Sequence, residues 1–311
     1  MGSNHQAEQM VDLLAKLAPH EGYTRSQLDS VRFMRANGPI GRTPVLYEPG
    51  IVIVCQGSKR GYLADKVYRY DSQHYLVLSV PLPFSTETDA TAQEPLLALS
   101  VGLDMTVLTE LIVMLDEEGY RAASPPQGII STPLDSALSD VTLRLLRALA
   151  SPLEGRILGP SIIRELYYRM LIGEQGGAIR AALASQGHFA RISRVLAHIH
   201  RCYDQPVSVG ELAKRAGLSI PAFHAHFRAI TNTSPVQYIK SVRLQQARLL
   251  MIRDNLTAAS AGQRVGYESP SQFNREFRRL FGRPPGEEAR VMRHAFSLLP
   301  SVQLAAVVAT H

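Results

Sequence analysis

The chain has 311 residues, 45% apolar and 19% charged, the composition of a globular protein large enough for two hydrophobic cores. It has no apolar run of about 20 residues that could span a bilayer, and residues 1–30 lack a secretory signal, so we expect a cytoplasmic protein without a membrane partner. The net charge of +6 is uneven: residues 189–293 hold 17 Lys and Arg against 7 Asp and Glu, which favours a polyanion-binding domain joined to a mildly acidic one.

The N-terminal part predicts a helix followed by a β domain. Residues 1–40 begin with the helical pattern AEQMVDLLAKLA, and from Pro44 onwards short β-rich runs alternate with turn-forming residues. Strands this short and this closely spaced indicate an antiparallel sandwich or small barrel, not a parallel sheet with crossover helices. The runs are PVLYEPGIVIVCQG, KRGYLADKVYRY, QHYLVLSVPL and PLLALSVGL.

After Asp104 the apolar residues recur at helical spacing. Apolar residues at steps of three and four predict one amphipathic helix over residues 134–149 and a second helix whose first turns are residues 162–170. The Pro and Gly residues between 152 and 160 are expected to separate the two helices. These helices either cover the barrel or pair with a second subunit, and the apolar spacing fits both roles.

Residues 189–293 are helical in pattern and contain an internal repeat. Each copy has a short helix, a turn with Gly, a Ser that caps the next helix, and two inward Phe residues on that helix. Corresponding residues are 50 positions apart: Ser219 and Ser269, Phe223 and Phe273, Phe227 and Phe277, Arg228 and Arg278. The same structural unit therefore occurs twice.

Two short helices joined in this way form a helix-turn-helix, whose second helix enters the major groove of DNA. Between the copies, SPVQYIKSVRLQQARLLMIRD predicts a helix of roughly 20 residues, which is about 30 Å long. Major-groove faces on one side of B-DNA are about 34 Å apart. One chain can therefore present two reading helices to consecutive grooves.

These segments resemble a known family. The stretches ELAKRAGLS, FHAHFRAITNTSPVQYIKSVRLQQARLLM and VGYESPSQFNREFRRLFGRPP resemble the DNA-binding region of the AraC/XylS-type transcription regulators. LYEPGIVIVCQGSKR, YDSQHYLVLSVPLPF and IRELYYRMLIGEQGGAIRAAL resemble the cupin-like effector domain of one branch of that family. The resemblance covers most of residues 25–290.

The resemblance implies an α+β protein of two domains that acts as a bacterial, ligand-responsive and dimeric transcription regulator. Residues 1–188 are then a cupin-like barrel with flanking helices for effector binding and dimerisation, residues 189–293 an all-α DNA-binding domain, and residues 294–311 an apolar tail without an assigned role. Double-stranded DNA and a small-molecule effector are the implied partners, with RNA polymerase as a further candidate.

The family's DNA-contacting positions carry over where the motifs align. Arg275 can bond guanine in a bidentate manner, and Asn274 or His224 can bond a base edge. Exposed basic side chains suit phosphates, which position a protein without reading sequence. The implied base-contacting residues are Pro221, His224, Ala225, Ser271, Asn274 and Arg275, and the phosphate-contacting residues are Arg228, Lys240, Arg243, Arg278 and Arg279.

Two residues depart from the family's pattern. Ala225 stands where many members have a long basic or amide side chain, so the first reading helix depends more on apolar contact, on His224 or on shape. Gly262 replaces an Ala at a packing position, which costs roughly 1 kcal/mol in a helix interior. We therefore hypothesise that the scaffold helix TAASAGQRVG is thinly packed and becomes firm only on DNA.

An effector is expected inside the barrel, since small barrels offer an apolar mouth with a few polar groups. Tyr47, Arg60, Tyr62 and His74 are the polar or aromatic strand residues that could line it, and Arg60 would favour an anionic ligand. The helices over residues 134–149 and 162–170 lie between the two modules in sequence and are candidates to carry the conformational response.

A metalloenzyme of the cupin type is set aside. The pairs His198/His200 and His224/His226 have the spacing of a strand metal site, but on a helix residues two apart point to different sides. His74 is the single His of the β region, too few ligands for a metal. No nucleophile elbow, phosphate loop or HExxH motif occurs. We expect no catalytic residues, metal or cofactor, and a protein that is not an enzyme.

Two other functions remain open. A ligand-independent dimeric DNA-binding protein would use the barrel for dimerisation alone. A thiol or electrophile sensor would use Cys55, if Lys59 and Arg60 lower its pKa. The sequence does not identify the effector, the operator, or whether the protein activates or represses.

Overall fold

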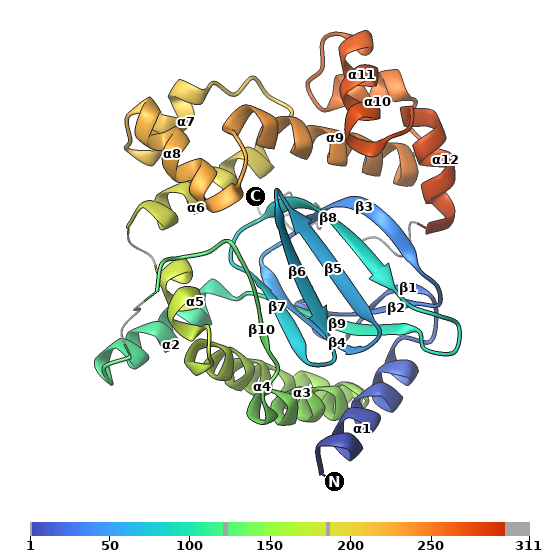
Figure 1. Ribbon diagram of the computed structural model, residues 1–311, viewed down its shortest axis with the longest axis vertical. Coiled ribbons are helices and arrows are strands. Elements are labelled where there is room, and N and C mark those ends of the chain that lie inside the picture. The colour runs from blue at the N-terminus through green and yellow to red at the C-terminus, as the bar shows by residue number, and fades with distance from the viewer. Residues whose placement is uncertain (1, 121–123, 185–186, 296–311) are drawn as a thin grey trace. The chain divides into compact units, whose positions relative to one another are not determined.

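The structure is a computed structural model that describes residues 2–120, 124–184 and 187–295 (Figure 1). The chain divides into two compact units, which are described separately below. The first comprises residues 1–42, 48–80 and 86–185, and the second residues 43–47, 81–85 and 186–311. None of the described helices is long and apolar enough to cross a membrane. Residues 296–311 of the apolar tail lie outside the described residues, whereas residues 294 and 295 end helix α12.

The β strands form one antiparallel sheet in the order β1-β2-β9-β4-β7-β6-β5-β8-β3, with β10 paired to β7. This arrangement confirms the predicted α+β class with an N-terminal antiparallel β domain. The bounds are β1 Gly22–Arg25, β2 Val31–Ala36, β3 Ile40–Tyr47, β4 Gly50–Gln56, β5 Ser58–Leu63, β6 Lys66–Asp71, β7 His74–Leu78, β8 Leu82–Asp89, β9 Leu96–Gly102 and β10 Ile129–Pro133.

Helices cover one face of the sheet in the first unit. Strand alternation sends Ile51, Ile53 and Cys55 of β4 into a core shared with helix residues such as Leu14 and Leu145. Figure 1 shows α1, α3 and α4 gathered on this side. The helices are α1 Gly2–Leu17, α2 Met105–Glu117, α3 Ser136–Leu149, α4 Pro152–Ile172 and α5 Gly176–Leu183.

The break predicted over residues 152–160, between the helices now seen as α3 and α4, is shorter in the structure. The structure ends α3 at Leu149 and begins α4 at Pro152, and α4 then continues through Gly159 and Pro160. Ser151 caps α4, and Pro152 lies in the first turn, where a missing N–H costs nothing. Gly159 permits a close approach, because a Cβ there would lie 2.6 Å from Leu28 Cδ1. Tertiary packing therefore keeps a helix where the sequence indicates a break.

The helices of the second unit confirm the predicted repeat. The two copies are α7 with α8 and α10 with α11, and the connecting helix α9 has 19 residues, close to the predicted length. In Figure 1, α7 and α8 lie at one end of α9 and α10 and α11 at the other. The helices are α6 Gly187–Arg201, α7 Val209–Ala216, α8 Ile220–Thr231, α9 Pro235–Arg253, α10 Ala258–Arg264, α11 Pro270–Phe281 and α12 Pro285–Ala295.

Candidate nucleic-acid interface

Local sequence signals define the first helix-turn-helix. Ser208 and Glu211 form a capping box at the start of α7, and α7 ends at Gly217, whose φ of 63° is left-handed. Ser219 then caps α8 by accepting a hydrogen bond from the Ala222 amide. Ser208 and Ser219 therefore cap the starts of the two helices, and Gly217 adopts the left-handed backbone that ends the first of them.

The second helix-turn-helix repeats this construction, and its turn leaves less space for a side chain. Gly266 has φ +85°, and a Cβ at this position would lie 2.6 Å from the Asp204 carbonyl oxygen. Ser269 caps α11 by accepting from the Gln272 amide. Both the conformation and the crowding thus require glycine at 266.

The reading helices turn their apolar residues inward and the predicted base-contacting residues outward. Phe223 and Phe227 of α8 and Phe273 and Phe277 of α11 are at most 1% exposed. The six predicted base-contacting residues are all exposed: Pro221, His224, Ala225, Ser271, Asn274 and Arg275. The arrangement leaves α11 with a polar outer face, and α8 with a mixed outer face in which His224 stands beside Pro221 and Ala225.

A basic surface adjoins the outer face of α11. A hollow beside this helix is lined by Asn274, Arg275, Arg278 and Arg279 together with residues 284–286. Arg228, the counterpart of Arg278 in the first helix-turn-helix, is also exposed. These guanidinium groups are free to meet phosphate oxygens.

Lys240 and Arg243, the other two predicted phosphate contacts, bond within the protein. Lys240 Nζ lies 2.7 Å from Glu276 Oε1. Arg243 donates to three carbonyl oxygens, those of Tyr203 at 2.6 Å, Gln205 at 2.8 Å and Gly266 at 3.1 Å. The two cations thereby attach the second helix-turn-helix to α9 and to the loop after α6.

Glu276 is a structural residue that the sequence reasoning missed. Besides Lys240, its carboxylate accepts hydrogen bonds from Tyr267 Oη at 2.8 Å and Gln272 Nε2 at 3.2 Å. Burial alone would raise the pKa of Glu276, but the bond from Lys240 and those from Tyr267 and Gln272 outweigh it and lower the pKa. The sequence signal for this role was an acidic residue on α11 that stands among exposed basic residues.

Gly262, the residue expected to thin the packing of α10, has an aromatic neighbour in the second helix-turn-helix. The Phe273 ring lies against it, since a Cβ at 262 would be 3.0 Å from Phe273 Cγ. The ring therefore fills the space that an alanine methyl would occupy. The same ring contacts Tyr267 edge-on, with centroids 5.3 Å apart. The glycine allows an aromatic contact in place of an aliphatic one.

The two histidine pairs lie on helices, as the sequence indicates. His224 is exposed, whereas His226 stacks on His188 with ring centroids 4.0 Å apart. On α6, His200 Nε2 lies 2.7 Å from Tyr238 Oη, and burial lowers the pKa of His200 to about 4. One member of each pair is thus engaged in packing.

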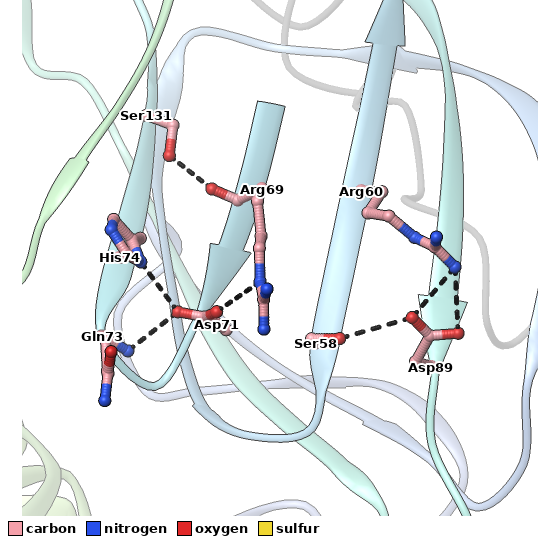
Figure 2. Close-up of polar contacts among 8 residues, drawn as sticks. All are labelled: Ser58, Arg60, Arg69, Asp71, Gln73, His74, Asp89 and Ser131. Carbon is pink, nitrogen blue, oxygen red and sulfur yellow. Dashed lines mark hydrogen bonds and ion pairs between the residues drawn. The ribbon is translucent and has the colours of Figure 1, made fainter. Parts of the chain in front are cut away.

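Two of the four predicted effector residues lie on the more open face of β5. Arg60 forms ion pairs with Asp89 at 3.1 Å and Glu87 at 3.5 Å, and Tyr62 donates to Glu87 (Figure 2 shows the Arg60 and Asp89 contact). The opposite face of β5 carries the buried residues Lys59, Gly61 and Leu63. The buried cation of this strand is therefore Lys59, which was not among the predicted effector residues.

The other two predicted effector residues differ in burial. His74 is partly exposed, and its Nδ1 lies 3.0 Å from Asp71 Oδ1, which also accepts from the Gln73 amide; Arg69 Nε lies 2.7 Å from the second oxygen (Figure 2). Tyr47 is 7% exposed, and its ring packs edge-on against Phe84 at 4.9 Å. His74 is thus part of a hairpin network, and Tyr47 part of an aromatic contact.

Cys55 lies in the core beneath the helices. It is 6% exposed, and burial raises the pKa of its thiol to about 12. The hypothesis that Lys59 and Arg60 lower this pKa is therefore wrong, because desolvation dominates. Nothing in this surrounding favours a reactive thiolate.

Family models match both parts of the chain. The model described as AraC-type transcriptional regulator N-terminus matches residues 27–178, and a helix-turn-helix domain model matches residues 212–290. An AraC-like transcription regulator of Streptomyces lividans is 29% identical over 170 residues, covering 52% of this chain and 55% of that protein. The Msm operon regulatory protein of Streptococcus mutans is 30% identical over 98 residues, 32% of this chain and 35% of that protein. The chain thus spans about half or less of these relatives' length.

Solved structures share the fold at low sequence identity. ToxT from Vibrio cholerae has a TM-score of 0.56 at 9% identity, with 86% of this chain and 98% of that chain covered. ToxT with an unsaturated fatty acid bound has a TM-score of 0.54 at 10% identity, with 91% and 99% covered. Two family models in the expected order, a shared two-domain fold and the duplicated helix-turn-helix lead to one conclusion: the chain belongs to the AraC-type transcriptional regulators.

Proposed function

We propose that the protein is a sequence-specific DNA-binding transcription regulator controlled by a small-molecule effector. Effector binding and dimerisation are assigned to residues 1–188 and DNA binding to residues 189–293. The observation that carries the proposal is the pair of exposed helix faces, on α8 and α11, joined by one 19-residue helix. At 1.5 Å per residue α9 is about 28 Å long, near the spacing of consecutive grooves.

The roles of the exposed side chains follow from their chemistry. Arg275 suits a bidentate bond to guanine O6 and N7, and Asn274 suits adenine N6 and N7. In the first helix-turn-helix, His224 provides one ring nitrogen to a base edge. Arg228 and Arg278 occupy equivalent places in the repeat, where they suit phosphates and set the position of each helix.

Fluorescence anisotropy on a DNA site selected from a random library tests this proposal. Loss of a bidentate base contact costs about 1–3 kcal/mol, so Arg275→Ala should weaken binding about 5- to 150-fold and relax selectivity at one base pair. Arg25→Ala, which removes the same charge from an exposed site of the first unit, is the matched control and should bind as the wild type. Equal affinity of both variants for selected and random DNA would refute sequence-specific reading.

Effector control rests on the β domain. The ToxT structure with an unsaturated fatty acid shows that a protein of this fold binds a small molecule. A ligand shifts DNA affinity only if it binds one arrangement of the protein better than another. Measuring DNA affinity with and without candidate ligands separates this function from a ligand-independent DNA-binding protein, whose affinity would not change.

Dimerisation is supported by an exposed apolar patch on α4. Leu153, Ile157 and Leu158 are 60%, 64% and 48% exposed, and Leu153 and Ile157, four positions apart, are neighbours on the helix surface. Sedimentation should give a dimer for the wild type and a monomer for Ile157→Glu. Val67→Glu, at an equally exposed apolar residue of the β6 strand, should remain dimeric; a monomeric wild type would refute the assignment.

A further inference from the structure

Lys59 is a buried cation without an acidic partner. Lys59 is 3% exposed. Its Nζ donates to Thr88 Oγ1 at 2.9 Å and lies 4.0 Å from Met34 Sδ. Neither partner carries a charge. Among the described residues, no carboxylate lies within ion-pair distance of this amine. An ammonium group in this position has lost its water without gaining a counter-ion.

The surrounding strands present an apolar wall on the same side. Residues paired across an antiparallel ladder point to the same face. Met34 pairs with Ala98, and Ala98 pairs with Val54, so all three share one face, and all are buried. This face is opposite to the one that packs on the helices, where Ile53 and Leu99 lie. The amine therefore lies against Met34, which belongs to this apolar face.

The nearby acids face the other way. Glu87 and Asp89 flank Thr88 on β8, and strand alternation places them on the opposite face, where they bind Arg60. Arg60 is thus neutralised by two carboxylates, and Lys59, its neighbour in sequence, by none. The burial of Lys59 also lowers the pKa of its amine to about 7, with desolvation as the cause.

We propose that Lys59 binds the carboxylate of an apolar organic acid, with Thr88 as a second hydrogen-bond donor and the wall of Met34, Ala98 and Val54 against the apolar part. The inference rests on the proposed function, because it names the chemical class of the effector assigned to the β domain. A carboxylate supplies the missing counter-ion, and its apolar part needs no further polar partner.

Binding of such an acid takes up a proton. The carboxylate favours the charged amine, so the neutral fraction of Lys59 must be protonated, and the affinity falls as the pH rises above about 7. On the same face lie the phenol of Tyr70, across the β5–β6 ladder, and the guanidinium of Arg32 on β2. His74 at the start of β7, bound to Asp71, is a titratable group to control for.

Isothermal titration calorimetry on the full chain tests the proposal. The probes are octanoate, phenylacetate and cinnamate, each beside its primary amide, at pH 6.5 and 8.5 in two buffers of different ionisation enthalpy. At least one acid should bind at least tenfold more tightly than its amide, about 20-fold more weakly at pH 8.5 than at pH 6.5, and with proton uptake. Equal affinity for acid and amide, or no binding of any acid, overturns the proposal.

Variants locate the effect. Lys59→Met should lose at least tenfold in affinity together with the proton uptake, and Thr88→Val should lose a smaller part. His74→Gln should keep both affinity and pH dependence, and thermal melts confirm that each variant is folded. Unchanged binding by Lys59→Met, or pH dependence lost in His74→Gln, overturns the role of Lys59.

A parallel measurement of DNA affinity separates this inference from the proposed function. If an uncharged compound changes DNA affinity while all the acids fail to bind, effector control stands and the Lys59 site is refuted. If an acid binds through Lys59 without any change in DNA affinity, the site stands and effector control is refuted.

Discussion

Lys59→Met should stabilise the free protein. The substitution keeps a linear side chain of similar length, removes the buried amine, and leaves Thr88 with one hydrogen bond fewer. In the wild type, burial lowers the pKa of Lys59 from 10.5 to about 7. Each tenfold change in proton affinity corresponds to about 1.36 kcal/mol, so the charged form is disfavoured in the folded state by about 5 kcal/mol.

The gain depends on pH in a defined direction. Between pH 7 and 10.5 the unfolded state binds a proton at Lys59 that the folded state lacks, so wild-type stability rises with pH over this range. Below pH 7 both states are protonated and the full penalty applies. The advantage of Lys59→Met should therefore be greatest near pH 6.5, at about 5 kcal/mol as an upper value, and fall to about 1 kcal/mol at pH 9.5.

Urea unfolding at the two pH values measures this difference. The chain has 12 Tyr and no Trp, so circular dichroism and tyrosine fluorescence are the suitable signals. Lys66→Met, at an exposed residue of β6, is the matched control and should change the free energy of unfolding by less than about 0.5 kcal/mol. A Lys59→Met protein less stable than the wild type at pH 6.5, or an advantage independent of pH, would refute the reasoning.

Three further predictions concern the second unit. Gly266→Ala should destabilise it by at least about 2 kcal/mol more than Gly282→Ala in urea unfolding, because both glycines have left-handed φ but Gly266 alone of the two is crowded, by the Asp204 carbonyl. Glu276→Gln should lower wild-type stability at pH 7 by about 1–3 kcal/mol, and the difference should shrink as the pH falls below 4.5, since the lowered pKa of Glu276 stabilises the fold only while the carboxylate is charged. Arg228→Ala should weaken binding to all DNA sequences alike and reduce the slope of log affinity against log salt by about 1, as measured by anisotropy; a sequence-dependent loss would argue for base contact.

The repeat was predictable because each element carries its own local signal. Ser caps before α8 and α11, glycines in the turns, and Phe pairs four residues apart all act within a few residues. Such local signals do not depend on tertiary contacts with the rest of the chain. The break expected near Pro160 failed for the opposite reason, since the packing of Gly159 on Leu28 is a tertiary contact.

The exposed positions of the predicted base-contacting residues follow from the sequence, whereas the surroundings of the basic residues do not. Arg60 and Lys59 are both basic, and the sequence does not say which of them faces inward. The two-residue alternation with Gly61 and Leu63 was the usable clue. Lys240 is predicted to contact phosphate, but its bond to Glu276, 36 residues away, could not be predicted because no local pattern joins the two residues. Charges on a surface and charges in a buried pair look alike in sequence.

The central claim is that one chain reads two consecutive major grooves. Methylation interference and hydroxyl-radical footprinting on a selected DNA site test it most directly, with wild type, His224→Ala and Arg275→Ala. We predict two contact patches on one face of the duplex about 10 base pairs apart, with each variant losing the base contacts of a different patch. A single patch, or the loss of the same patch in both variants, would contradict the account.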